Sequence, residues 1–140
     1  MVDYSSSLMR IYRVMHFLWE KHIPILPFLL MKYIRVIYSI ELPPSVVIGK
    51  KSFFMHNGLG CVIHAKSIIG NNVLIYQNVT LGGRNGKSGI SIGDNVIIGA
   101  GACVLGNIVI ADNVKIGANA VVLSDISCGK TAIGIPARIV

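Results

Sequence analysis

Large apolar residues recur at every sixth position through the second half of the chain, and this period restricts the fold more than any other feature. The anchors are Ile92, Ile98, Val104, Ile110, Ile116 and Val122. The position four later is again apolar. The position three later mostly holds asparagine or glycine, which tolerate a left-handed turn; these corners are Asn95, Gly101, Asn107, Asn113, Asn119 and Asp125. Short strands joined by tight corners give this pattern, whereas helical periodicity and simple strand alternation do not. We predict a solenoid with coils of about eighteen residues.

The repeat loses its phase at two places, and both are candidate functional sites. The first lies between Phe54 and Ile63 and contains a histidine, His56. The second follows Leu81, where a glycine-rich segment with two cations, residues 82–89, delays the next anchor. Insertions in a solenoid project from one face and often form its binding site. We therefore expect a histidine at a bulge and a projecting loop.

Residues 1–40 lack the repeat and are expected to form a helical arm that precedes a solenoid domain, residues 41–140. We predict one helix over residues 8–22 and, after two prolines, a second over about residues 27–39. The longest uncharged apolar run, residues 23–31, is too short to span a bilayer.

The first predicted helix is amphipathic. Its polar side would carry Arg10, Arg13, His16 and Glu20, and its apolar side Leu8, Ile11, Met15, Leu18 and Trp19. We expect the arm to cap the open end of the solenoid or to pack on a partner subunit, with His16 and His22 in solvent. Membrane-surface contact is a weaker alternative, which basic amphipathic helices also permit.

Composition and charge exclude several classes of function. Hydrophobic residues make up 53% of the chain and charged residues 14%, so intrinsic disorder is excluded. The net charge of +7 is spread along the chain without a basic cluster, which disfavours nucleic acid. A polyanionic small molecule or an acidic membrane surface suits this balance better.

Cysteine and histidine spacing argues against disulfides and metals. Cys61, Cys103 and Cys128 are odd in number and lack C-x-x-C spacing, and the four histidines share no short spacing. We find no cleavable signal peptide, because charged residues interrupt every apolar run near the start. We expect a cytoplasmic protein, with the inner membrane surface left open as its location.

Three motifs, in this order, resemble the serine acetyltransferase branch of the left-handed β-helix acyltransferases. They are Asn-Val-Thr-Leu-Gly-Gly at 78–83, Ile-Gly-Ala-Gly-Ala at 98–102 and Gly-Ile-Pro-Ala-Arg at 134–138. The resemblance covers about residues 41–140 and implies a mainly β fold, a left-handed parallel β-helix. The left-handedness of the β-helix is implied by the resemblance alone, because crossover connections between parallel strands are otherwise right-handed. The resemblance also implies a homotrimer, with higher assembly left open, and acetyl transfer from acetyl-CoA to a hydroxyl without a metal.

The catalytic pair of that family is a carboxylate fifteen residues before a histidine, and Glu41 and His56 occupy these positions. Glutamate stands where the family usually has aspartate. Histidine suits a general base at neutral pH, and a carboxylate on its other nitrogen would fix the tautomer. The alternative for His56 is a corner residue bonded to backbone. Gly82 and Gly83 are expected to let backbone N–H groups approach the developing oxyanion.

The remaining candidates concern the two substrates. For CoA, we expect Ala100 in the binding groove, and Lys115, Lys130 and Arg138 near the phosphates. On the acceptor side, the candidates are Met55, His64 and Arg84.

Two departures from the resembled enzymes bear on the acceptor. Those enzymes usually have aspartate immediately before the catalytic histidine, where this chain has Met55, and an Arg-His pair in the loop, where residues 84–91 contain no histidine. Because these groups handle the charges of an amino acid, we predict a saccharide hydroxyl as acceptor, in surface-polysaccharide synthesis. Serine O-acetylation for cysteine biosynthesis is the alternative. A non-catalytic trimeric scaffold is a further alternative.

Overall fold

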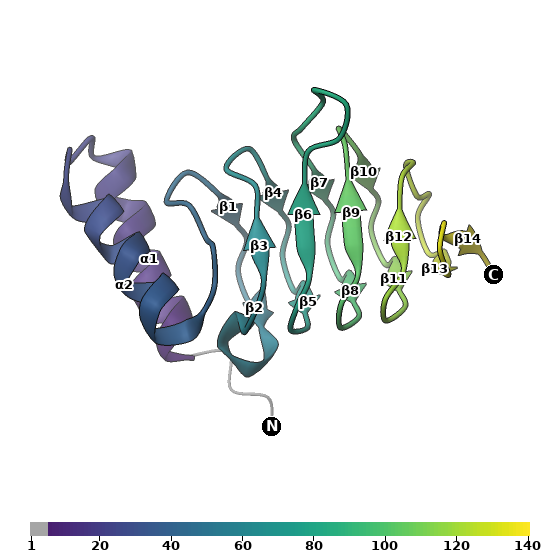
Figure 1. Cartoon of the computed structure of the whole chain (residues 1–140), viewed down its shortest axis with the longest axis horizontal. Coiled ribbons are helices and arrows are strands. Elements are labelled where there is room, and N and C mark those ends of the chain that lie inside the picture. The colour runs from purple at the N-terminus through teal and green to yellow at the C-terminus, as the bar shows by residue number, and fades with distance from the viewer. Residues whose placement is uncertain (1–5) are drawn as a thin grey trace.

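The structure, a computed structural model, describes residues 6–140 and consists of two helices followed by a stack of short strands (Figure 1). Residues 1–5 of the predicted arm lie outside the described residues. The helices are α1 (Ser7–Glu20) and α2 (Leu26–Tyr38), and a 3-10 turn, η1, spans Met55–Gly58. The strands are β1 (Val47–Ile48), β2 (Phe53–Phe54), β3 (Val62–Ile63), β4 (Ile68–Ile69), β5 (Leu74–Ile75), β6 (Thr80–Gly82), β7 (Ser91–Ile92), β8 (Ile97–Ile98), β9 (Cys103–Leu105), β10 (Val109–Ile110), β11 (Lys115–Ile116), β12 (Val121–Val122), β13 (Thr131–Ile133) and β14 (Arg138–Ile139).

Successive strands fall into three different sheets, which makes the chain a solenoid. The sheet orders are β1-β4-β7-β10, β2-β5-β8-β11-β13-β14 and β3-β6-β9-β12. All pairings within them are parallel except that of β13 with β14. Ser91 pairs with Val109 and Ile97 with Lys115, which confirms a coil of about eighteen residues.

The core is a column of apolar side chains along the solenoid axis. All six predicted anchors are 2% exposed or less. The predicted corners Asn95, Gly101, Asn113 and Asn119 adopt positive φ. The corner predicted at Asn107 is one residue off, because β9 runs through Leu105 and Gly106 takes the positive φ instead. Asp125 is likewise not among the positive-φ residues; its Oδ1 accepts a hydrogen bond from Val109 N.

The arm packs on the first coil, as expected of a cap. Helix α1 begins after Ser6, whose Oγ accepts a hydrogen bond from Met9 N. The buried residues of α1 are Leu8, Met9, Tyr12 and Met15. Trp19, predicted on the apolar side, is exposed. The buried stripe is therefore rotated from the predicted one, because Tyr12 and its neighbours turn toward the solenoid.

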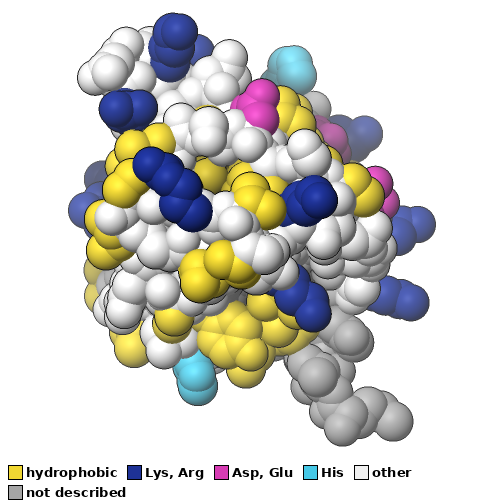
Figure 2. Space-filling model, turned by 90° about the vertical axis from the view of Figure 1, so that its right-hand side faces the viewer, with side chains coloured by type: hydrophobic (Ala, Val, Ile, Leu, Met, Phe, Trp, Pro, Cys, Tyr) yellow, Lys and Arg dark blue, Asp and Glu magenta, His cyan; other side chains and the backbone are white. Residues whose placement is uncertain are grey.

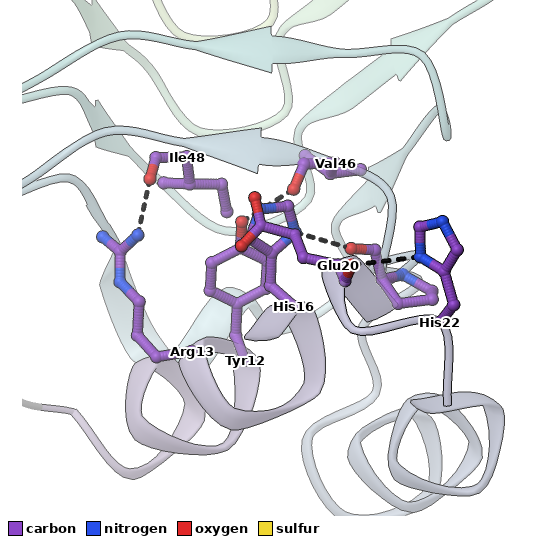
Figure 3. Close-up of polar contacts among 8 residues, drawn as sticks. Tyr12, Arg13, His16, Glu20, His22, Val46 and Ile48 are labelled. Carbon is purple, nitrogen blue, oxygen red and sulfur yellow. Dashed lines mark hydrogen bonds and ion pairs between the residues drawn. The ribbon is translucent and has the colours of Figure 1, made fainter. Parts of the chain in front are cut away.

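Three side chains of α1 bind backbone carbonyl groups of the first coil (Figure 3). Tyr12 Oη donates to Val46 O at 2.7 Å. Arg13 donates to Ile48 O at 2.6 Å and to Gly49 O at 2.7 Å. His16 Nδ1 lies 2.8 Å from Pro44 O; a carbonyl only accepts, so Nδ1 carries the proton. The prediction that His16 is solvated was wrong, because the first coil has no preceding coil to satisfy these carbonyls.

Neither α1 nor α2 has the length and hydropathy that a bilayer-spanning segment needs, within the described part of the chain.

Candidate functional site

The first phase break forms the turn η1, directly after β2. His56 and Asn57 both take a left-handed backbone, with φ of 53° and 52°. His56 is exposed, and its ring has no hydrogen-bond partner among the described residues. A left-handed backbone at a residue other than glycine is uncommon, but this chain also has it at His22 and at several asparagines, so the exposed ring at a phase break, and not its φ, makes His56 a candidate. The predicted bulge with an accessible imidazole is thus present.

Glu41 lies on a segment that runs beside the chain leaving this turn. Its N–H donates to Cys61 O at 2.9 Å, and its carbonyl accepts from Ile63 N at 2.9 Å. One residue pair nearer the turn, Gly60 N donates to Ser39 O. Glu41 therefore lies on a segment that is hydrogen-bonded to the chain just after the turn of His56, although the two residues are fifteen positions apart in the sequence.

The carboxylate of Glu41 contacts a cation of α2. Arg35 Nη1 lies 2.8 Å from Glu41 Oε2, which makes an ion pair, although its alignment is not that of a hydrogen bond. Within residues 6–140, no hydrogen bond joins the carboxylate to the ring of His56. Arg35 was not predicted as a site residue; the contact depends on how α2 packs, which no sequence spacing reveals.

The second phase break forms a small ordered hairpin that projects from the solenoid after β6 (Figure 1). Arg84 N donates to Lys87 O, and Lys87 N donates to Arg84 O. Gly82 and Gly83 lie at its base, and a Cβ on either would approach another group to 3.2 Å. Both cations line one cavity of about 300 Å³, together with Asn85, Leu105, Gly106, Asn107, Ile108 and Leu123. Lys87 was not among the predicted site residues, although its position in the glycine-rich loop could have indicated it.

His64 lies beside the strand that leads into the double glycine. Its N–H donates to Leu81 O at 2.8 Å. Its Nδ1 accepts from Lys66 N at 3.1 Å, so Nδ1 is unprotonated and Nε2 carries the proton of the neutral ring. Met55, the other acceptor-side candidate in this part, is half-buried in η1 and packs against the core.

The predicted CoA-binding residues lie on or next to the six-stranded sheet. Ala100 follows β8, Lys115 is on β11 and Arg138 is on β14. Lys130 O accepts from Lys115 N at 2.9 Å, so Lys130, immediately before β13, lies beside β11. Lys115, Lys130 and Arg138 are all exposed. Figure 2 views the C-terminal end of the molecule, where Lys and Arg side chains lie among exposed apolar groups.

A cavity of about 830 Å³ lies away from these residues, between the turn that joins the helices and β1. Its lining includes Trp19 and Phe28, whose rings meet edge to face, and His16, which lies 3.5 Å from Glu20. None of the predicted site residues lines it. In the described part of the chain, no three His, Cys, Asp or Glu side chains are grouped closely enough to hold a metal ion.

Comparison with known sequences finds serine acetyltransferases among the relatives of this chain. The family described as "Bacterial transferase hexapeptide (six repeats)" matches residues 89–124. The serine acetyltransferase of Synechococcus elongatus is 43% identical over 132 residues, which is 92% of this chain and 54% of that protein. The serine acetyltransferase of a Synechocystis strain is 47% identical over 133 residues, 93% of this chain and 53% of that protein.

Solved structures give the same result. The soybean serine acetyltransferase apoenzyme superposes with a TM-score of 0.88 at 42% identity, over 95% of this chain and 56% of that one. A serine acetyltransferase in complex with CoA gives 0.87 at 39% identity, over 95% and 55%. These matches confirm the predicted left-handed β-helix. They also extend into the arm, so the predicted limit of the resemblance at residue 41 was too narrow. The chain spans a little over half the length of these relatives.

Proposed function

We propose that this chain, which belongs to the hexapeptide-repeat family of left-handed β-helix acyltransferases and to its serine acetyltransferase-like branch, transfers an acetyl group from acetyl-CoA to a hydroxyl. The observation that carries the proposal is 43% identity to a serine acetyltransferase over 92% of the chain. The accessible imidazole at the first bulge and the loop cations at the second support it.

In this reaction His56 removes the hydroxyl proton while the oxygen attacks the thioester carbonyl carbon. The C–S bond then breaks, and the CoA thiolate leaves with the proton that the imidazolium returns. Glu41 would stabilise the imidazolium. Because Arg35 lies against Oε2 of Glu41, the other oxygen, Oε1, is the one we assign to His56. Gly82 and Gly83 remain our candidates for the backbone N–H groups that stabilise the oxyanion. The loop cations Arg84 and Lys87 form a second candidate anion-binding site, besides the exposed cations near the C-terminus.

Serine is the acceptor that we propose first, because the relatives are serine acetyltransferases and one matched soybean structure is described as complexed with serine. The prediction of a saccharide in surface-polysaccharide synthesis therefore becomes the second candidate. It still has specific support in Met55, which lacks the carboxylate that an amino group would pair with, and in a loop that carries Arg84 but not the histidine of the Arg-His pair.

The test is thiol release from acetyl-CoA by the purified chain, offered serine and then a panel of sugars and oligosaccharides. We expect release with serine and a loss on the order of 10²–10⁴-fold in His56→Ala. His22→Ala is the matched control, because His22 is an exposed histidine of the arm whose ring lies in hydrogen-bond distance of Glu20 O, at 3.0 Å. Release with a sugar but not serine would restore the saccharide acceptor. No release with any acceptor, and no CoA binding by titration calorimetry, would favour the non-catalytic scaffold.

We further propose a cytoplasmic homotrimer. The sheet that contains β1, β4 and β10 turns Val47, Ile68 and Val109 outward, each about half exposed. Ser91 of β7 lies between Ile68 and Val109, and a mainly apolar face of this kind is a suitable contact for a second copy.

A further inference from the structure

Helix α2 exposes a continuous apolar face that no other part of residues 6–140 covers. Pro27 and Ile34 are its buried residues. On the opposite side, Ile25, which caps the helix, and Leu29, Tyr33 and Val36 are each at least half exposed, and Val36 reaches 80%. Steps of three and four residues place these four on one helical stripe, named here the outer face of α2. Isolated exposed apolar residues need no explanation, but a contiguous stripe indicates a binding surface.

The position of α2 leaves this face accessible. The helix packs mainly on α1, and α1 is the helix that binds the first coil through Tyr12, Arg13 and His16. Figure 1 shows the helical pair at one end of the solenoid, away from the C-terminus. The cap is therefore made by α1, and it does not require the outer face of α2.

Charge indicates the chemistry of the partner. The described part of the arm, residues 6–40, contains five cations and one acid: Arg10, Arg13, Lys21, Lys32, Arg35 and Glu20. That acid lies beside His16, and Glu41, just after the arm, lies beside Arg35. Arg13 binds carbonyls of the first coil and Arg35 pairs with Glu41, so Lys32 is the cation of α2 that remains beside the apolar stripe. A cation beside an apolar stripe complements an anionic surface.

Lys32 favours a membrane over a protein as the anionic partner of the outer face of α2. It lies within the stripe, between Leu29 and Val36, is exposed, and makes no ion pair among the described residues. In a dry protein interface an unpaired lysine is unfavourable, and lysine is depleted from such interfaces. In a second copy, the same face would bring another lysine rather than an acid. At a bilayer surface, the lysine stem stays in the apolar layer while the ammonium reaches lipid phosphates.

We propose that the outer face of α2 binds an anionic lipid bilayer, with the helix in the plane of the interface. Ile25, Leu29, Tyr33 and Val36 would enter the boundary between headgroups and acyl chains, and Lys32 would contact phosphates. The inference does not depend on the acetyl transfer proposed above, and the two can fail separately.

The test is flotation of the full chain with vesicles of phosphatidylcholine, alone or mixed with phosphatidylglycerol. We expect binding to the anionic vesicles that weakens with added salt. Val36→Asp should reduce the partition coefficient at least about tenfold by placing a charge in the apolar stripe. Lys32→Glu should reduce it by a similar factor for anionic vesicles, because it reverses a charge at the surface.

Ile135→Asp is the matched control, since Ile135 is 74% exposed and lies between β13 and β14, which Figure 1 shows at the end of the molecule opposite the helices. It should float as the wild type does. Circular dichroism checks that each variant is folded, and thiol release from acetyl-CoA checks the enzyme activity separately. The proposal is overturned if the wild type does not float with anionic vesicles, or if Val36→Asp and Ile135→Asp float equally. A change of oligomer mass in Val36→Asp, without vesicle binding by the wild type, would identify a protein interface instead.

Discussion

Tyr12 is the residue at which burial, a hydrogen bond and ionisation act together. The phenol is buried, and its hydroxyl donates to Val46 O at 2.7 Å. Burial raises the pKa of Tyr12 to about 12, and Arg13 partly opposes this rise. Above pH 10 the unfolded chain releases the phenol proton while the folded chain retains it. The contribution of Tyr12 to stability is therefore constant below pH 10 and declines between pH 10 and about 12.

Tyr12→Phe should lower the free energy of unfolding by about 1–2 kcal/mol at neutral pH, because Val46 O loses its donor. The variant should also lose stability less steeply than the wild type above pH 10. Urea denaturation at a series of pH values measures both effects. Tyr38→Phe is the control, since its hydroxyl bonds Ser7 Oγ at an exposed place and its loss should cost little. Parallel alkaline curves for wild type and Tyr12→Phe would contradict the assignment.

The candidate catalytic residues show how far reasoning from single residues extends. His56 could be predicted because a phase break is visible in the sequence, and the turn η1 is present there. Its pairing with Glu41 stays a prediction. The ion pair of Glu41 with Arg35 could not be foreseen, because it depends on the docking of α2 rather than on any local pattern.

At the scale of one coil, glycine is required where successive corners touch. A Cβ on Gly70 would lie 2.6 Å from Gly93 O and 2.6 Å from Asp94 Oδ1 in the next coil. Asp94 Oδ1 also accepts a hydrogen bond from Asn71 N at 2.7 Å, so the contact cannot simply be widened. The corners are therefore stacked as tightly as the strands.

Gly70→Ala should destabilise the protein by about 1–3 kcal/mol through this crowding. Gly129→Ala provides the comparison, because a Cβ there meets nothing within 4 Å and only its φ of 72° opposes the change. Urea midpoints for both variants separate crowding from backbone strain. A urea midpoint for Gly70→Ala equal to that of the wild type would show that neighbouring coils can move apart.

Strands and helices differed in how well the sequence predicted them. The anchors were correct because a six-residue period is local and repeats many times. The predicted polar and apolar sides of α1 were partly wrong, because Arg13 and His16 bind carbonyls of the first coil while Trp19 is exposed. Polarity alone does not show whether a cation faces water or a backbone carbonyl.

At the scale of the whole molecule, the proposed trimer gives a direct measurement. The mass of one chain is 15.1 kDa. Light scattering at micromolar protein should give about three chain masses. Ile68→Asp should lower this value, because it places a charge on the outward, mainly apolar face, whereas Ile135→Asp should not. A single-chain mass for the wild type would contradict the trimer.

Both ends of the stack are also closed. At one end, side chains of α1 occupy the carbonyls of Val46, Ile48 and Gly49; at the other, β14 pairs antiparallel with β13. A parallel solenoid with bare ends could add another molecule coil upon coil and grow into a fibre. The helical cap and the reversed last strand thus act as terminators of polymerisation, and they keep a repeating fold at a finite length.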